Sequence, residues 1–534
     1  MNLSRALGSV GGLTLASRVL ALLRDTLQAS YVGAGFASDA FFVAFRLPNM
    51  FRALFAEGAF SAAFIPLFNR KVAEGGGERG DGIAAGVDFA ERALAVLFPV
   101  LLVFTAAMLV AAWPITWALS GGFDKQHPSP GQFAFAVSLS RWTIPYLMLI
   151  SLVSLLGGIL NSLNRFWVNA AAPILLNIAM VGSLLFFHGP DPYATARAQA
   201  VSVTVGGALQ LGWLWLACRA SGVSLRPRLP RLDADVRRLL ALIVPAAAGA
   251  GAAQINLAIS TALAGGLLSA GSISAIYYAD RLNQLPLGMI GIGLGTILLP
   301  VVSRLLSEGR EAEAMETQNR GLELALFLTL PATAAFIFAA EPLVRGLFQH
   351  GAFDAADTRR TAYALAAFSI GLPSYVLVKV LTPGFYARAD TRTPVRLALY
   401  SVAINLAGNL LLIPLLGRYE LGQIGPPLAT AVASSVNVAS LYVVLARRGH
   451  FTLDAQLRRK VPRLAMAALL MGASLLFVTP WVEPYLTGGL AIRAAALTVL
   501  VGTGVLVYAL SCFATGAFRL ADIRTLLQRR AASR

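Results

Sequence analysis

Four arginines lie within segments that otherwise have the composition of membrane-spanning helices. They are Arg18, Arg24, Arg52 and Arg281. A central arginine in a spanning helix costs roughly 2.5–3.5 kcal/mol, so four that faced lipid would cost on the order of 10–14 kcal/mol. Guanidinium groups bind phosphate oxygens in pairs and stay charged at every physiological pH. These arginines are therefore expected to face counter-charges, water or an anionic substrate, for which a diphosphate is a natural fit.

The first span carries polar side chains at helical spacing. Ser17 lies seven residues before Arg24, and Arg18 lies seven residues before Asp25, so each pair falls on nearly the same face of a helix. Arg24 and Asp25 have an alternative interpretation as interfacial charges that extend to the membrane surface, whereas Arg18 is too deep for this. The first span is therefore expected to present charge to a cavity.

The second span continues this pattern. Asp39 and Arg46 are seven residues apart on one face, and Asn49, Arg52 and Glu57 follow. A structural ion pair is the alternative to a role for the carboxylates in transport. The arginines outnumber these partners, and Arg281 adds a cation from far along the chain. Positive charge is expected to converge from both halves on a central space.

The composition predicts an all-α polytopic membrane protein. The chain has 534 residues, of which 57% are hydrophobic and 13% charged, and its mean hydropathy is +0.69. About fourteen apolar segments are long enough to cross a bilayer of about 30 Å. They lie near 8–30, 39–68, 93–119, 134–160, 167–188, 198–218, 239–264, 272–303, 322–348, 361–386, 396–416, 426–446, 462–481 and 491–514.

The net charge of +17 comes mostly from alternate loops. This distribution is typical of the positive-inside rule and argues against nucleic-acid binding, which needs one basic patch. It places both termini in the cytoplasm, with the chain in the inner or plasma membrane and the N-terminus retained as a first helix. The segment after Arg519 alternates apolar and basic residues and is expected to lie on the inner leaflet.

The two halves of the chain form a weak internal repeat. Asp39 to Arg46 parallels Ser274 to Arg281, and similar offsets relate Pro114 to Pro342, Pro145 to Pro373 and Asn177 to Asn405. The repeat predicts an N-lobe at 1–220 with six spans, a C-lobe at 221–448 with six, two further helices at 449–516 and a tail at 517–534. In such architectures the substrate site lies between the lobes, near interrupted helices.

The second and eighth spans are the expected interrupted helices. Pro48, Gly58 and Pro66 fall in one, while Pro286, Pro300 and four glycines between them fall in the other. The glycines, among them Gly291 and Gly295, serve either close helix packing or a hinge.

Signatures of an enzyme are weak. The histidines lack metal-ligand spacing, Cys218 and Cys512 offer neither a disulfide framework nor a metal cluster, and the sequence has neither a Walker loop nor a nucleophile elbow. Asp390 follows the tenth span, where a helix-start carboxylate is favoured over an ion ligand. We therefore expect a transporter without a cofactor.

The motifs resemble one known family. They are Ser17-Arg18-Val, Arg24-Asp25, Asp39-Ala-Phe-Phe-Val-Ala-Phe-Arg46-Leu-Pro-Asn49, Arg52 with Phe55-Ala-Glu57-Gly-Ala-Phe60, Tyr277-Tyr-Ala-Asp280-Arg281-Leu, and Gly295-Thr-Ile-Leu-Leu-Pro300. They look like those of the MurJ (MviN-type) lipid II flippases of the multidrug/oligosaccharidyl-lipid/polysaccharide exporter superfamily. The resemblance covers essentially the whole chain.

The resemblance implies a fourteen-helix fold with two six-helix lobes and two last helices that form a lipid-tail groove. It implies outward translocation of lipid II, the undecaprenyl-diphosphate-linked peptidoglycan precursor, and makes the cell-wall synthesis machinery a candidate partner. By matching position it assigns substrate binding to the four arginines Arg18, Arg24, Arg52 and Arg281. It assigns portal or gate positions to Ser17, Asp25, Asp39, Asn49 and Glu57.

The chain departs from some relatives at a sodium site in the second lobe. Asp390 matches the aspartate of that site, but Tyr386 occupies the position of its asparagine. Coupling to a monovalent ion is therefore in doubt, and Asp390 is only a weak sodium candidate. Membrane potential acting on buried charges, worth about 2.3 kcal/mol per charge per 100 mV, is the other expected energy source.

The expected mechanism is alternating access, in which arginines hold the diphosphate while the lobes rock. Two alternatives remain at this point. A related exporter of another polyprenyl-diphosphate-linked glycan or of drugs has the same architecture, although cationic drugs call for a carboxylate-rich cavity. A membrane-embedded glycan transferase needs a catalytic acid or a metal site that the motifs do not supply.

Overall fold

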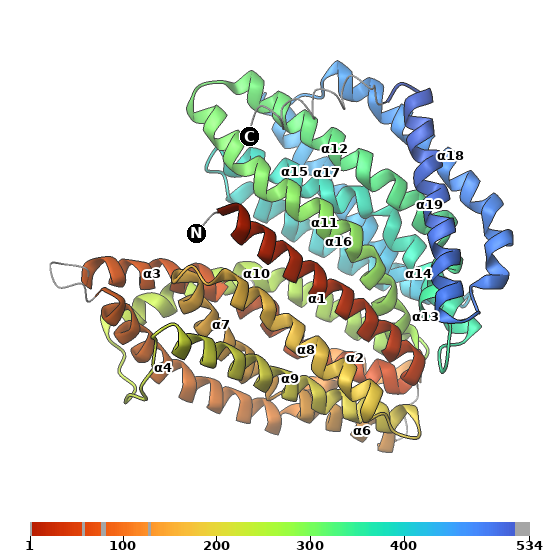
Figure 1. Cartoon of the computed structure of the whole chain (residues 1–534). Coiled ribbons are helices and arrows are strands. Elements are labelled where there is room, and N and C mark those ends of the chain that lie inside the picture. Colours follow the sequence, from red (N-terminus) through yellow and green to blue (C-terminus); the bar gives the residue numbers. More distant parts are fainter. Residues whose placement is uncertain (1–2, 56–58, 76–81, 127–129, 518–534) are drawn as a thin grey trace. The chain divides into compact units, whose positions relative to one another are not determined.

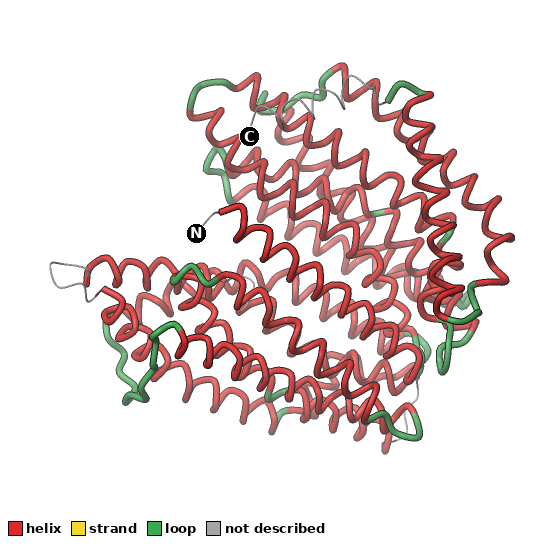
Figure 2. Tube along the Cα trace, in the orientation of Figure 1, coloured by secondary structure: helices red, strands yellow, loops and turns green. Residues whose placement is uncertain are grey.

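The computed structural model describes residues 3–55, 59–75, 82–126 and 130–517. Within these ranges the chain is helical with short connections, and no strand is present (Figures 1 and 2). The described residues divide into two compact units. The first contains residues 1–274 and 351–353, and the second contains 275–350 and 354–534. The predicted N-lobe and C-lobe end after residues 220 and 448. These boundaries were drawn from the internal repeat and not from the packing of the helices, so they stay predictions.

The first unit contains the helices up to α10. They are α1 (Leu3–Val32), α2 (Phe36–Phe55), α3 (Ala59–Gly75), α4 (Gly82–Val110), α5 (Ala112–Ser120), the 3-10 helix η1 (Gly121–Gln126), α6 (Pro130–Thr143), α7 (Tyr146–Ser162), α8 (Phe166–Phe186), α9 (Pro192–Ala220) and α10 (Ala234–Leu267). α8 packs between α1 and α9, and α7 also packs on α9 (Figure 1).

The second unit contains the helices from α11 onward. They are α11 (Ser272–Ser307), α12 (Glu311–Phe338), α13 (Ala340–Phe348), α14 (Ala355–Ile370), α15 (Leu372–Tyr386), α16 (Arg392–Gly417), η2 (Gly422–Ile424), α17 (Gly425–Arg447), α18 (Ala455–Val482), η3 (Glu483–Tyr485) and α19 (Leu490–Ala514). The first turn of α11 belongs to the first unit.

Each of the fourteen predicted spans coincides with one helix or with two consecutive helices. Ten segments of the described chain are long and apolar enough to cross a membrane. The remaining four predicted spans correspond to α1, α2 with α3, α10 and α11. Three of these four carry the intramembrane arginines. The protein is therefore a multi-pass helical membrane protein whose least apolar spans are those that bear the candidate site.

Equivalent prolines of the repeat lie at equivalent breaks between helices. The α4–α5 break at Ala111 and the α12–α13 break at Ala339 are each followed by a proline three residues later, Pro114 and Pro342. Pro145 lies in the break between α6 and α7, and Pro373 is the second residue after the break at Gly371. A proline lacks the N–H for a helical hydrogen bond and favours the start of a helix. The repeat therefore has a structural counterpart.

The prediction that prolines interrupt the second and eighth spans is wrong for the described residues. α11 is one continuous helix through Pro286 and Pro300, and Pro48 and Pro66 lie inside α2 and α3. Spanning helices tolerate internal prolines because neighbouring groups satisfy the backbone carbonyls that lose a donor. Gly58, between α2 and α3, lies outside the described residues.

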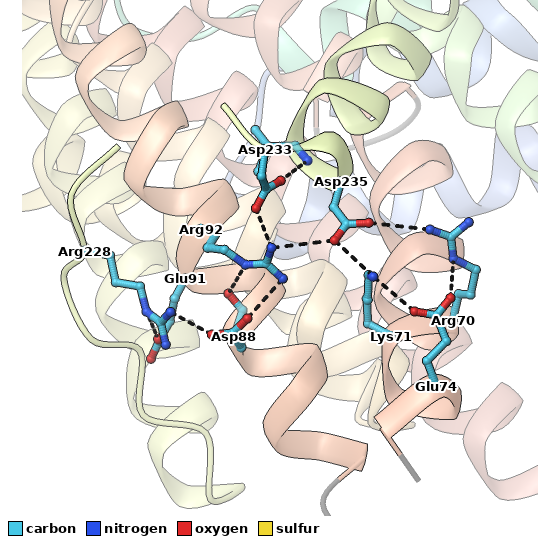
Figure 3. Close-up of polar contacts among 10 residues, drawn as sticks. Arg70, Lys71, Glu74, Asp88, Glu91, Arg92, Arg228, Asp233 and Asp235 are labelled. Atoms are coloured by element: carbon cyan, nitrogen blue, oxygen red, sulfur yellow. Dashed lines mark hydrogen bonds and ion pairs between the residues drawn. The ribbon is translucent and has the colours of Figure 1, made fainter. Parts of the chain in front are cut away.

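The linker between α9 and α10 is extended and held by a buried carboxylate of α4 (Figure 3). Glu91 accepts a hydrogen bond from the Arg226 backbone N–H at 2.9 Å and one from Arg228 Nε at 2.6 Å. Asp88, one turn before Glu91, pairs with Arg228 Nη1 at 2.7 Å. The linker is therefore fixed along the end of α4.

The first turn of α10 joins the same group of charges. Asp233 is the N-cap residue and accepts from the Val236 N–H at 2.8 Å, while Arg92 of α4 pairs with Asp233. Asp235 accepts from the Lys71 ammonium of α3 at 3.0 Å, and this hydrogen bond raises the pKa of Lys71. These contacts tie α3, α4 and α10 together at one end of the first unit (Figure 3).

The two last helices pack as a pair against α12 in the second unit (Figure 1). Their core contains Leu464, Met471 and Leu500, and Tyr508 donates its hydroxyl to the Phe327 carbonyl at 2.8 Å. Polar contacts hold the pair at both ends, since Lys460 pairs with Glu323 and Arg345 with Glu483. α18 and α19 are therefore an integral part of the second unit.

Candidate functional site

Arg24 lies in the contact between α1 and α8 and is almost completely buried. Its side chain makes an ion pair with Asp25, in which Nε and Nη2 donate to Oδ1 at 3.0 and 2.7 Å. Arg24 is only 5% exposed and Asp25 only 1%. Because both charges are buried, the interpretation that they extend to the membrane surface is wrong. A buried pair of this kind is costly to break, since either partner alone would be an uncompensated charge.

Asn177 of α8 connects this ion pair to Ser17. Its Oδ1 accepts from Arg24 Nη1 at 3.1 Å, and its Nδ2 donates to the Ser17 carbonyl at 3.1 Å and to the Ser17 hydroxyl at 3.4 Å. Ser17 and Arg24 share a face of α1, as their spacing of seven residues predicts. One amide of α8 therefore holds two turns of α1.

The position of α8 is itself fixed by two amides of α9. Gln199 Nε2 donates to the Met180 carbonyl at 2.8 Å, and Gln210 Nε2 donates to the Ala172 carbonyl at 3.0 Å. The Tyr146 hydroxyl of α7 donates to Gln210 Oε1 at 3.2 Å. These contacts join α7, α8 and α9. Asn177 is thus presented to Arg24 from a layer of three connected helices.

Arg18 differs from Arg24 in its surroundings. Its side chain is half-buried, and among the described residues no acceptor lies within hydrogen-bonding distance of it. Its sequence partner by spacing, Asp25, is engaged by Arg24.

Arg52 and Asn49 form a contact on α2. Arg52 Nε donates to Asn49 Oδ1 at 3.1 Å, and Arg52 is half-buried. Glu57, the predicted gate residue that follows, lies outside the described residues.

Asp39 binds the start of α11. The fully buried carboxylate accepts from the Gly271 N–H at 2.8 Å, from the Ser274 N–H at 2.7 Å and from the Ser274 hydroxyl at 2.5 Å. A carboxylate in this place satisfies N–H groups that a helix start leaves without partners, and it complements the positive end of the helix dipole. The structure thus gives Asp39 a capping role. Arg46, seven residues on, donates to Thr261 of α10 at 2.8 Å.

Arg281 belongs to the second unit, on α11. It is half-buried, and the neighbouring Asp280 accepts from Gln284 Nε2 at 2.5 Å. The convergence of Arg281 with the arginines of the first unit stays a prediction.

Asp390 is held between two helices of the second unit. Its Oδ1 accepts from the Thr393 N–H at 2.9 Å, in the first turn of α16, and its Oδ2 pairs with Arg448 at 2.7 Å. Hydrogen bonds from Thr393 and Arg448 keep the pKa of Asp390 well below its usual range. The geometry agrees with a helix-start carboxylate. Asp390 as a weak sodium candidate stays a prediction, and an ion at its carboxylate would compete with Arg448.

Several polar residues of the spans were not singled out from the sequence. Asn177 was visible only as a repeat equivalent of Asn405. Gln28, one turn after Arg24, is buried, and its amide atoms have no hydrogen-bond partner among the described residues. Lys379 is a lysine within the apolar α15, and a Cβ placed on Gly291 would lie 3.1 Å from its ammonium. A search for every polar residue inside a predicted span would have found all three.

Comparison with known proteins places this arrangement in a family. The family model described as lipid II flippase MurJ matches residues 28–495. A probable lipid II flippase MurJ of Rhizobium tropici is 40% identical over 535 residues, covering 99% of this chain and 97% of the relative. The lipid II flippase MurJ of Burkholderia cenocepacia is 37% identical over 476 residues, covering 88% of this chain and 89% of the relative.

Solved structures share the fold. A lipid II flippase MurJ in an inward closed conformation superposes with a TM-score of 0.72 at 23% identity, covering 94% of this chain and 97% of the other. An inward-facing multidrug resistance MATE transporter of the MOP superfamily gives 0.63 at 16% identity, covering 81% and 94%. The fold is therefore common to lipid and drug transporters, whereas the relatives with 37–40% identity are all MurJ proteins. The chain belongs to the MurJ family.

Proposed function

We propose that the protein is a flippase that moves lipid II from the cytoplasmic to the periplasmic leaflet of a bacterial inner membrane, in the service of peptidoglycan synthesis and cell shape. The observation that carries the proposal is the set of intramembrane arginines in a chain of the MurJ family. A diphosphate headgroup supplies the negative charge that such arginines need inside a membrane. The protein is a transporter and not an enzyme.

Three arginines of the first unit offer different degrees of access to this headgroup. Arg18 and Arg52 are half-buried, whereas Arg24 is covered by Asp25 and Asn177. Arg18 and Arg52 are suited to a first encounter with the diphosphate, and Arg24 to a later stage. Arg281 supplies the cation of the second unit. Substrate that binds one arrangement of the arginines better than another shifts the equilibrium between states, which is the basis of alternating access.

The membrane orientation follows from the charged loops. The arginine-rich connections face the cytoplasm, and so do both termini. The predicted tail at 517–534 lies, apart from its first residue, outside the described residues. The polyprenyl chain of the substrate stays in lipid beside α18 and α19. Membrane potential acting on the buried charges, or a monovalent cation, resets the carrier.

Export of cationic drugs is disfavoured by the carboxylates of the first unit. Asp25 is paired with Arg24, and Asp39 is occupied by the start of α11. A cationic drug needs an accessible carboxylate in its cavity, and both candidates are already neutralised or hydrogen-bonded.

The test is the leaflet exposure of lipid II in cells depleted of the protein. Complementation with the natural chain restores exposure at the periplasmic surface, whereas Arg24→Ala and Arg281→Ala do not. The matched control is Arg396→Ala, an exposed arginine of α16, which restores exposure. Membrane abundance of each variant is measured in parallel. Normal outward exposure with either cavity variant contradicts the proposed site, and failure of the natural chain contradicts the substrate.

A second arm of this test separates lipid II from other polyprenyl-diphosphate glycans. Purified protein in vesicles is given labelled lipid II together with an excess of polyprenyl diphosphate that carries no sugar or peptide. Competition by the bare diphosphate is expected, because the arginines recognise phosphate oxygens. Flipping of a lipid with an unrelated glycan at the same rate would favour the broader exporter.

A further inference from the structure

Arg24 is expected to bind substrate, yet it is covered in this structure. Among the described residues, its guanidinium contacts Asp25 of α1 and both Asn177 and Met180 of α8. Asp25 is the next residue of α1 and holds Nε and Nη2. Asn177 stands on α8 and holds Nη1 at 3.1 Å. Asp25 therefore moves with Arg24, whereas the contact with Asn177 depends on how α1 packs against α8.

The contact with Asn177 also controls the position of α1. The same amide donates to the carbonyl and hydroxyl of Ser17, two turns before Arg24. Asn177 is itself 5% exposed and lies in the layer fixed by Gln199 and Gln210. A movement of α1 away from α8 breaks all three hydrogen bonds together and uncovers Nη1.

The chemistry of the amide suits an exchange with phosphate. An amide oxygen is a neutral acceptor, so its hydrogen bond to a guanidinium is weaker than one made by a phosphate oxygen. Asp25 neutralises the buried arginine while no substrate is bound, and Asn177 accepts from Nη1 without adding a second negative charge. A carboxylate at position 177 would compete with phosphate on equal terms.

We propose that Asn177 is a positioning residue, which holds Arg24 Nη1 and α1 until a phosphate oxygen of the substrate takes its place. The proposal rests on the proposed function, because it requires Arg24 to bind an anionic headgroup. It assigns to α8 a role in substrate capture that the four arginines by themselves do not include.

The repeat provides an internal control for this idea. Asn405 of α16 is the equivalent residue of the second half and is 2% exposed. Its Nδ2 donates to the Thr430 hydroxyl at 3.0 Å, and its carbonyl and side-chain oxygens both accept from Asn409 Nδ2 at 3.0 Å. Each of these contacts is made with a neutral group. Asn405 therefore resembles Asn177 in burial but not in the charge of its partners.

The test compares two substitutions that should act in opposite directions. Asn177→Asp strengthens the hold on Nη1 and is expected to raise the KM for lipid II flipping by about tenfold, the difference between a charged and a neutral hydrogen bond. Asn177→Ala removes the competitor and is expected to lower the KM by about threefold. Asn177→Ser serves in its place if the alanine variant does not fold. The measurement uses the full-length protein in vesicles with labelled lipid II.

Asn405→Asp is the matched control and is expected to leave the KM unchanged. A role of Asn177 in packing alone predicts that both Asn177 variants lower the unfolding temperature and leave the KM equal to that of the natural chain. Equal KM values, or shifts of the same sign, overturn the proposal. If the natural chain does not flip lipid II at all, the proposed function fails instead, so the two failures are distinguishable.

Discussion

Asn177 and Asn405 occupy equivalent positions of the repeat, but they serve different neighbours. Asn177 joins a buried arginine to the backbone of α1, while Asn405 joins neutral hydroxyl and amide groups of α16 and α17. The prolines at the equivalent helix breaks show that the backbone of the two halves follows one plan. The side chains that Asn177 and Asn405 contact, however, differ in charge between the two halves.

The same divergence separates the arginines of the two halves. Arg24 is buried and neutralised within the first unit, whereas Arg281 is half-buried beside Asp280. A buried charge needs a partner at all times, because desolvation is costly without one. Arg281, by contrast, keeps part of its surface exposed.

The largest expected effect is on the free energy of unfolding when Arg24 or Arg281 is replaced by alanine. Arg24→Ala leaves Asp25 buried without its partner and is expected to lower the free energy of unfolding by about 3–5 kcal/mol. Arg281→Ala is expected to cost about 1 kcal/mol or less, because the site is only half-buried. Denaturant unfolding of the purified proteins in detergent measures the difference. Equal losses in the free energy of unfolding would show that the two arginines contribute equally to stability, which contradicts the difference in burial.

An intermediate effect is expected at Asp39 and its repeat equivalent Ser274, which contact each other. Asp39→Ala leaves two backbone N–H groups and one hydroxyl at the start of α11 without their acceptor, at an expected cost of about 2–3 kcal/mol. Ser274→Ala removes only the hydroxyl and is expected to cost about 1 kcal/mol. Thermal unfolding at matched detergent concentration tests the order. A greater loss in Ser274→Ala would contradict the capping role of Asp39.

The smallest effect is expected from pH. His350, in the loop after α13, accepts from Arg493 Nη1 at 2.9 Å, and burial, followed by the charge of Arg493, lowers its pKa. Its stabilising contribution is therefore present above the ordinary histidine pKa of about 6.5 and is lost as the pH falls through the lower folded value. The unfolding temperature should fall slightly between pH 7.5 and 5. His350→Gln should flatten that dependence.

Much of the fold was predictable from local composition. Apolar length predicted all fourteen spans, and Pro114, Pro145, Pro342 and Pro373 marked the helix breaks because proline acts on its own backbone. The same reasoning failed at Pro286 and Pro300, which α11 contains without a break. There the carbonyls that lose a donor depend on neighbouring helices, which a local rule does not include.

The candidate site was predictable in its residue types but not in its contacts. The cost of a charge in hydrocarbon depends only on the residue and its depth, so the sequence alone identified Arg18, Arg24, Arg52 and Arg281. Some partners of these residues are close in sequence, such as Asp25 beside Arg24 and Asn49 near Arg52. Asn177 on α8 lies more than a hundred residues from Arg24, and no local pattern predicts that contact. Helical spacing placed Ser17 and Arg24 on one face but did not indicate what faces them.

The sequence by itself determined the membrane class, the positions of the helices in the predicted spans, and the family, and its basic loops predict an orientation. These follow from composition and short motifs, which act through hydrophobic transfer and through the backbone of each residue. Only the tertiary structure decided that Arg24 pairs with Asp25 and donates to Asn177, and that Asp39 caps α11. A buried polar group takes its partner from whichever helix the packing brings within hydrogen-bonding distance, and that choice is made by the assembled core.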